Sequence, residues 1–212
     1  SCAGWQSGLY QRRTDMVIYL IRHGMTAGNQ KKRYIGRTDE PLCQEGRERL
    51  EQIRKCALYE RPDLLYVSPM LRCLETAQIL FPGMEQSVIA DFRECDFGEF
   101  ENQNYLELAG NANYQKWIDS NGMLPFPGGE SREAFQTRSV KIFEGLEQFW
   151  KSNGYQKQIA ALVVHGGTIM SILEKVGIPN RSYYDFQAGN GEGYRLEGEN
   201  GSYRYEKICY TQ

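Results

Sequence analysis

The sequence predicts an α/β fold: a three-layer α/β/α sandwich with a mostly parallel central sheet, an antiparallel edge strand and a helical insertion over one end of the sheet. Continuous apolar runs at 17–21 and 159–164 are typical of strands buried on both faces of a parallel sheet. Segments with helical spacing alternate with the strands, which is the order that builds such sandwiches. Near the C-terminus, Asn200-Gly201 favours a tight hairpin turn, so we expect the last two strands to be antiparallel.

The first half of the chain alternates between strands and helices. The run 17–21 is the first strand, and apolar residues at helical spacing over 45–59 predict the first long helix. A second strand is expected over 64–67. Ser68-Pro69 ends this strand and opens the next helix, because proline is favoured in a first helical turn, so Arg72 falls in that turn.

The second half contains an insertion and a second helix-strand-helix unit. Residues 97–126 are rich in Asn, Gly and aromatic side chains, and we interpret them as the insertion. Apolar residues over 135–150 predict a long amphipathic helix with Ser131 as its N-cap. The remaining expected elements are strands at 88–90, 159–164, 193–197 and 203–208 and a short helix at 168–176.

One globular domain is expected over 16–212. A chain of 212 residues with 41% hydrophobic side chains can bury a substantial core, and no repeat or low-complexity tract divides it. Residues 1–15 are polar and precede the first strand. We therefore interpret them as an N-terminal extension outside the core.

Composition argues against several classes of function. Lys and Arg total 25 against 27 Asp and Glu, so the net charge of -2 provides no global field for nucleic acid or an anionic membrane. The six cysteines form no CxxC pair, which argues against a zinc ribbon or a thioredoxin-like redox motif. No apolar run has the length of a signal sequence or a membrane span. We expect a cytoplasmic protein.

Both histidines of the chain and two arginines follow predicted strands. Arg22-His23-Gly24 follows the first, Arg72 follows the second through Ser68-Pro69, and His165-Gly166-Gly167 follows 159–164. Ligands of open parallel sheets bind at this end of the strands. Two guanidiniums beside two imidazoles would repel one another in an empty site, so the cluster makes physical sense around an oxyanion such as phosphate. The neighbouring glycines would let backbone N–H groups approach that anion.

Phosphoryl transfer at such a cluster needs a nucleophile and a proton donor for the leaving alkoxide. One neutral imidazole can form an N–P bond, while the other, as imidazolium, stabilises the transferring group together with the arginines. This chemistry requires no metal and no cofactor. Glu94, Asp96 and Glu99 are three candidates for the general acid, and their spacing does not choose among them.

Four motifs in order resemble the histidine phosphatase superfamily, the phosphoglycerate-mutase-like fold, from Met16 to about Leu196. An RHG triplet alone is weakly specific, whereas the four together are highly specific. They are Leu20–Asn29 with Tyr34–Leu42, Ser68–Arg72 with Thr76-Ala77, Phe92–Glu94 with Phe97–Glu99, and Val163–Gly167.

The resemblance implies that His23 is the phosphorylated nucleophile and Glu94 the proton donor. It also implies that Arg22, Arg72 and His165 act on the phosphate as catalytic and binding groups, and that Asn29 lines the same pocket. To these we add the backbone of Gly166 as a substrate-binding group, because it follows His165 at a strand end.

Three segments resemble one branch of the superfamily, the alpha-ribazole phosphatases of cobalamin biosynthesis and their broad-specificity relatives. They are Gly36–Asp39, Phe97–Glu101 and especially Pro127–Ser131. This implies a phosphomonoester hydrolase of small metabolites, with alpha-ribazole 5′-phosphate the most favoured substrate and sugar or nucleotide phosphates next. One departure is Phe100–Gln103, where the family often has Trp followed by Glu-Gly.

Two other functions are compatible with this pattern. A phosphoglycerate mutase would protect its phosphohistidine from water until an acceptor arrives. A non-catalytic phospho-ligand-binding regulatory protein would have lost its nucleophile or a clamping arginine, and this sequence has lost neither. The expected partner is a small phosphate ester, without nucleic acid or membrane, and a homodimer is left open. Packing is the favoured interpretation of four aromatic side chains in and near the insertion, Tyr105, Tyr114, Trp117 and Phe126.

Overall fold

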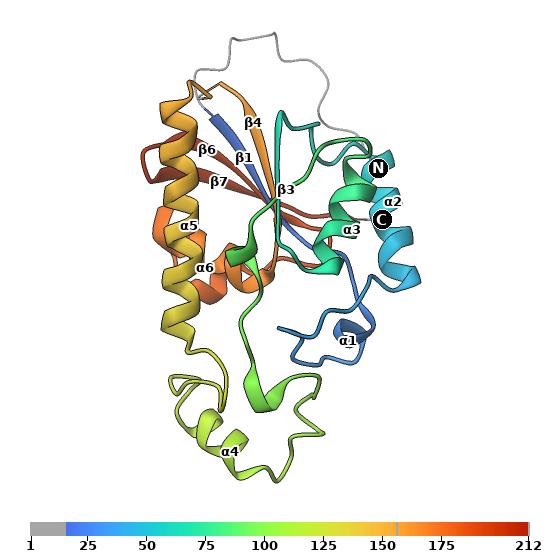
Figure 1. Cartoon of the computed structure of the whole chain (residues 1–212), viewed down its shortest axis with the longest axis vertical. Coiled ribbons are helices and arrows are strands. Elements are labelled where there is room, and N and C mark those ends of the chain that lie inside the picture. The colour runs from blue at the N-terminus through green and yellow to red at the C-terminus, as the bar shows by residue number, and fades with distance from the viewer. Residues whose placement is uncertain (1–15, 156, 212) are drawn as a thin grey trace.

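The computed structural model describes residues 16–155 and 157–211, and its centre is a seven-stranded sheet of order β3-β2-β4-β1-β6-β7-β5 (Figure 1). Pairing is parallel from β3 to β1, and β6 is antiparallel to both β1 and β7. The predicted sandwich with its antiparallel hairpin is confirmed. The strands are β1 (Met16–Arg22), β2 (Leu64–Val67), β3 (Ser87–Val88), β4 (Ile159–Val164), β5 (Gly177–Ile178), β6 (Gly193–Glu199) and β7 (Ser202–Ile208).

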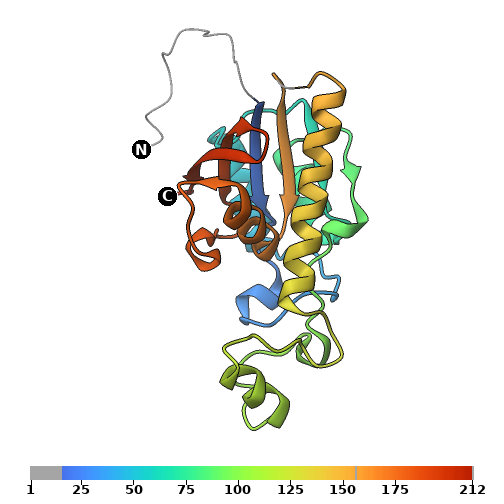
Figure 2. The same ribbon diagram turned by 90° about the vertical axis from the view of Figure 1, so that its left-hand side faces the viewer.

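Helices cover both faces of the sheet (Figures 1 and 2). Ile18 and Leu20 of β1 pack in the core beneath α5 and α6, whereas the alternate residues Val17, Tyr19 and Ile21 pack in the core beneath α2 and α3. This period of two is what a strand buried on both faces requires. The α-helices are α1 (Ala27–Gln30), α2 (Gln44–Lys55), α3 (Leu71–Leu80), α4 (Ala112–Asp119), α5 (Arg132–Ser152) and α6 (Gly166–Val176), and the 3-10 helices are η1 (Ala90–Phe92), η2 (Gly98–Phe100) and η3 (Tyr183–Phe186).

Three predicted boundaries were wrong. The first long helix stops at Lys55 rather than at 59, because Ala57 adopts the left-handed conformation with φ of 49°. The third strand pairs only over Ser87–Val88, and the chain then turns into η1. The last helix begins at Gly166 instead of 168, which brings its N-terminus directly behind His165.

The insertion has an aromatic core of its own. Figure 1 shows it beyond the carboxyl end of the sheet, with α4 as its only α-helix in the described residues. Phe100 and Phe126 are buried, and Tyr114 and Trp117 stack at 6.2 Å between ring centroids. Tyr105 is exposed. Packing is therefore confirmed as the role of three of the four aromatic side chains.

Other predictions about the chain lie outside what the structure describes. Residues 1–15, expected to be an extension, are not among the described residues, so the domain boundary at 16 stays a prediction. No helix in the described ranges is long and apolar enough to cross a bilayer. Localisation in the cytoplasm also stays an expectation.

Candidate active site

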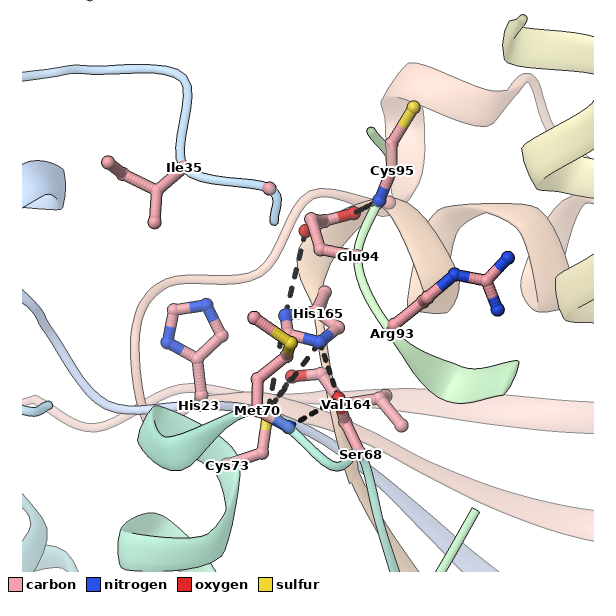
Figure 3. Close-up of polar contacts among 12 residues, drawn as sticks. His23, Ile35, Ser68, Met70, Cys73, Arg93, Glu94, Cys95, Val164 and His165 are labelled. Atoms are coloured by element: carbon pink, nitrogen blue, oxygen red, sulfur yellow. Dashed lines mark hydrogen bonds and ion pairs between the residues drawn. The ribbon is translucent and has the colours of Figure 1, made fainter. Parts of the chain in front are cut away.

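The site lies where three adjacent parallel strands end. Arg22 of β1 pairs with Val164 of β4, and Val67 of β2 pairs with Val163, so the residues that follow these strands emerge side by side. His23 and His165 face each other with ring centroids 5.3 Å apart (Figure 3). The predicted convergence of the two histidines is thus present in the structure.

The hydrogen bond at Nδ1 determines which tautomer His23 adopts. Nδ1 lies 2.7 Å from the carbonyl oxygen of Gly24, and because a carbonyl can only accept, Nδ1 carries the proton. Nε2 then has a free lone pair. Burial, followed by the charges of Arg72 and Arg22, lowers the pKa of His23 well below 6.5, so the ring is neutral at physiological pH. A neutral imidazole with a free Nε2 is a competent nucleophile.

His165 is completely buried and held by polar contacts at the end of β4. Its Nε2 is 2.8 Å from the hydroxyl of Ser68, and the thiol of Cys73 lies 3.7 Å from the same nitrogen (Figure 3). Burial and the Arg72 charge lower the pKa of His165 well below 6.5. In the free site two guanidiniums and a dry environment therefore oppose a third positive charge, and the imidazolium expected during phosphoryl transfer stays a prediction.

Arg22 is the last residue of β1, and its side chain lies beside the start of α6. Its Nη1 donates to the carbonyl of Ala188 at 2.7 Å, while its buried Nε has no hydrogen-bond partner among the residues that the structure describes. A Cβ placed on Gly166 would lie 3.5 Å from that Nε, so the guanidinium sits beside the first residue of the helix. The structure therefore brings Arg22 and the backbone of Gly166 together, as predicted, at a helix N-terminus that favours anions.

Arg72 is fully buried in the first turn of α3. Its Nη1 donates to the carbonyl of Thr38 at 3.0 Å, and its Nη2 donates to the carbonyls of Ile35 and Gly36 at 3.3 and 3.1 Å. Its Nε is buried and has no hydrogen-bond partner within residues 16–155 and 157–211. Two of the five guanidinium N–H donors thus remain for another acceptor.

Glu94 is the acid of its segment that reaches the histidines. Oε2 lies 3.7 Å from Nδ1 of His165, and Oε1 accepts the N–H of Cys95 at 2.9 Å (Figure 3). Burial raises the pKa of Glu94, although the arginines oppose the shift. The other two candidates are engaged elsewhere, since Asp96 pairs with Arg37 and Glu99 accepts from Asn113.

Asn29 and Gly24 have structural partners. The side-chain oxygen Oδ1 of Asn29 accepts the N–H of Thr26 in a capping box and also accepts from the side-chain amide of Asn190. The N–H of Gly24 donates to Thr76, so it is not available to an anion, contrary to our expectation for the glycines beside the histidines. Gly24 is small for another reason, because a Cβ there would lie 2.6 Å from Leu50.

Sequence reasoning missed two residues that support the site. Asn190 donates from its side chain to the carbonyls of both His23 and Gly24, and it lies in a stretch of Gly and Asn that resembles any loop. Arg138 pairs with Glu130 and donates to the carbonyls of Asp91 and Arg93, just before Glu94. Only the short distance along the chain between the Pro127–Ser131 motif and Arg138 of α5 could have suggested this supporting role.

The arrangement collects cationic groups around unfilled donors. The buried Nε atoms of Arg22 and Arg72, two neutral imidazoles and the start of α6 meet at one end of the sheet, and this set of donors is suited to a tetrahedral oxyanion. No group of three or more His, Cys, Asp or Glu side chains in the described part of the chain could hold a metal ion.

A family model for the histidine phosphatase superfamily (branch 1) matches residues 18–211. The chain belongs to this superfamily. The resemblance of the four motifs to this superfamily is thereby confirmed.

Similar proteins support a phosphatase without agreeing on its substrate. This histidine phosphatase is 28% identical over 203 residues to a protein of Hydrogenobacter thermophilus whose name assigns it to the phosphoserine phosphatases, covering 92% of this chain and 97% of that one. It is 26% identical over 182 residues to the adenosylcobalamin/alpha-ribazole phosphatase of Escherichia coli, with coverage of 83% and 87%. The crystal structure of the alpha-ribazole phosphatase from Shigella flexneri shares the fold, with a TM-score of 0.79, 23% identity and coverage of 91% and 96%.

Proposed function

We propose that this histidine phosphatase hydrolyses phosphomonoesters of small metabolites through a phosphohistidine on His23, without a metal. The observation that carries the proposal is the free Nε2 of a neutral, buried His23 between two arginines that have unfilled donors.

In the first step Nε2 of His23 attacks the phosphorus as the ester P–O bond breaks. Arg22, Arg72 and the start of α6 hold the non-bridging oxygens, where negative charge is concentrated. Glu94 gives its proton to the leaving alkoxide, and its raised pKa favours the protonated form that this role requires. His165, held by Ser68, donates a hydrogen bond to the transferring group.

In the second step water attacks the phosphorus and the N–P bond breaks. Glu94, now ionised, accepts the proton of the water, which returns the carboxylic acid and releases inorganic phosphate. The neutral Nε2 of His23 is restored, so the cycle balances without a metal or cofactor.

We propose alpha-ribazole 5′-phosphate as the first substrate to test. This proposal is supported by the resemblance of Gly36–Asp39, Phe97–Glu101 and Pro127–Ser131 to the alpha-ribazole phosphatases. A relative of that name also supports it. Phosphoserine is the main competing substrate. Another relative is named as a phosphoserine phosphatase, and this chain matches it over 97% of its length. In this structure Gly129 packs against the backbone of Asp96 and Gly98, so the motif supports the segment after Glu94.

The decisive experiment is phosphate release from a panel of phosphomonoesters in the presence of a chelator. The panel contains alpha-ribazole 5′-phosphate, phosphoserine, 3-phosphoglycerate and p-nitrophenyl phosphate, with His23→Ala as the control. We expect steady release from at least one ester by the wild type and none by His23→Ala. Loss of activity in chelator would refute metal independence.

The same panel separates the alternatives. Transfer between phosphoglycerates that exceeds release to water would identify a mutase. Phosphate binding without turnover of any ester would indicate a regulatory phospho-ligand-binding protein. Either result would refute the proposed hydrolase.

A further inference from the structure

Arg72 is a buried cation without a direct carboxylate partner. It is fully buried, and its three hydrogen bonds within the described residues all end on backbone carbonyls of Ile35, Gly36 and Thr38. A buried charge ordinarily needs a counter-charge. A carboxylate in direct contact, however, would compete with the phosphate for the two remaining N–H donors.

Glu101 lies on the opposite side of the same loop. Its Oε1 accepts the N–H groups of Arg37 and Phe97 at 2.8 and 3.2 Å. Its Oε2 accepts the N–H of Gly36 at 3.2 Å and both the N–H and the hydroxyl of Thr38 at 3.3 and 2.8 Å. Five hydrogen-bond donors therefore converge on the Glu101 carboxylate.

Two peptide groups connect the carboxylate with the guanidinium. The peptide between Ile35 and Gly36 donates its N–H to Glu101 and accepts from Arg72 through its carbonyl. The peptide between Gly36 and Arg37 does the same. Each is therefore polarised from both ends, and hydrogen bonds in such chains strengthen one another.

We propose that Glu101 is a positioning residue for Arg72, acting as its counter-charge through these two peptides and thereby setting the affinity of the site for phosphate. The carboxylate fixes the loop carbonyls that aim the guanidinium. Because it stays one peptide away, it leaves the remaining donors of Arg72 free for the substrate. This inference rests on the proposed function, in which Arg72 binds the phosphoryl group.

The geometry around the loop leaves little room for another arrangement. A Cβ on Gly36 would lie 2.0 Å from the Cys95 carbonyl and 2.4 Å from Oε1 of Glu101, so only glycine lets the loop lie this close to the carboxylate. Asn102, which follows Glu101, has φ of 57°, in the left-handed region that glycine and asparagine tolerate best. This explains why asparagine can stand here where the family often has glycine.

Isothermal titration calorimetry with inorganic phosphate tests this inference without depending on turnover. Glu101→Gln should weaken phosphate binding about tenfold, the lower end of the loss caused by removing a carboxylate behind a metal ligand. Glu107→Gln is the matched control, because Glu107 holds Arg33 of the same loop but makes no contact with Gly36, Arg37 or Thr38. It should bind phosphate like the wild type.

A double-mutant cycle distinguishes positioning from a general structural role. If Glu101 acts through Arg72, then Glu101→Gln should have no further effect on phosphate binding in an Arg72→Ala background. Additive losses, or wild-type binding by Glu101→Gln, would overturn the inference. A wild type that does not bind phosphate at all would instead refute the proposed function.

Thr38→Val provides a second variant if Glu101→Gln does not fold, as judged by circular dichroism. It removes one of the five donors and keeps all three carbonyls that hold Arg72. It should weaken phosphate binding measurably but less than Glu101→Gln does in a folded protein. An unchanged affinity for phosphate in Thr38→Val would count against the action of Glu101 on Arg72 through the two peptides.

Discussion

Replacing Glu94 by glutamine should lower kcat/KM only for those substrates whose leaving group needs a proton. Glutamine keeps a carbonyl oxygen for the N–H of Cys95 and nearly the same shape at a position where the Glu94 side chain is 12% exposed, so the fold should persist. The proton donor, however, is lost, and the neighbouring acids Asp96 and Glu99 are held by Arg37 and Asn113. We expect no substitute for the missing acid.

The expected loss is therefore the whole contribution of general-acid catalysis, about 10² to 10⁴ in rate, or about 3 to 5 kcal/mol. It should appear in kcat/KM for an alkyl phosphate, since that constant reports events up to cleavage of the ester. For p-nitrophenyl phosphate, whose anion leaves without a proton, kcat/KM should change little. Its kcat should still fall, because Glu94 also activates the water of the second step.

Steady-state and burst kinetics on the two esters check this prediction. Glu99→Gln is the matched control, because it removes an acid of the same segment that hydrogen-bonds to Asn113 rather than approaching His165. It should leave both values of kcat/KM unchanged. An equal fall of kcat/KM on both esters in Glu94→Gln would refute the assignment of Glu94 as the acid.

Two further predictions concern stability. The lowered pKa of His23 means that the unfolded chain, with a histidine pKa near 6.5, binds the proton more readily, so stability is lost as pH falls below about 6.5. Urea unfolding at pH 7.5 and 5.5 should show a loss that is smaller in His23→Gln by up to about 1.4 kcal/mol, and equal losses in both proteins would contradict the buried neutral state. Trp150→Phe removes the donor that bonds the Tyr66 hydroxyl at 2.9 Å in the core and should lower the free energy of unfolding by about 1 to 2 kcal/mol with kcat unchanged. Phe149→Leu, at a half-exposed neighbouring position, should change it by less than about 0.5 kcal/mol, and a similar loss in both variants would rule out the hydrogen bond as the cause.

The sheet and the convergence of the histidines were predictable because both depend on short-range patterns. Two uninterrupted apolar runs identify buried parallel strands, and adjacency of those strands places His23 and His165 together. Family resemblance chose Glu94 among three acids, and the structure is consistent with that choice, since Glu94 alone of the three is within 4 Å of His165.

Two of the features that could not be predicted depend on contacts between segments distant in the chain, and a third is a local backbone conformation. Asn190 lies 167 residues after His23, and nothing in its neighbourhood distinguishes it from a turn residue. The protonation of His165 follows from the combined effect of burial and two arginines, which no local pattern reports. The boundary at Lys55 depends on a single left-handed residue, Ala57, of a type that rarely adopts this conformation.

The aromatic core of the insertion defines how far this enzyme can be re-engineered. Glu101 connects the start of the insertion to the phosphate end of the site, whereas the chain after Asn102 packs against its own aromatic side chains and Tyr34 and pairs with the loop through Glu107 and Arg33. A segment transplanted from a relative should therefore begin after Asn102 and carry side chains that cover Phe100 and Phe126. Exchanged in this way, the insertion could change during evolution or in the laboratory while the phosphate-binding residues are inherited intact.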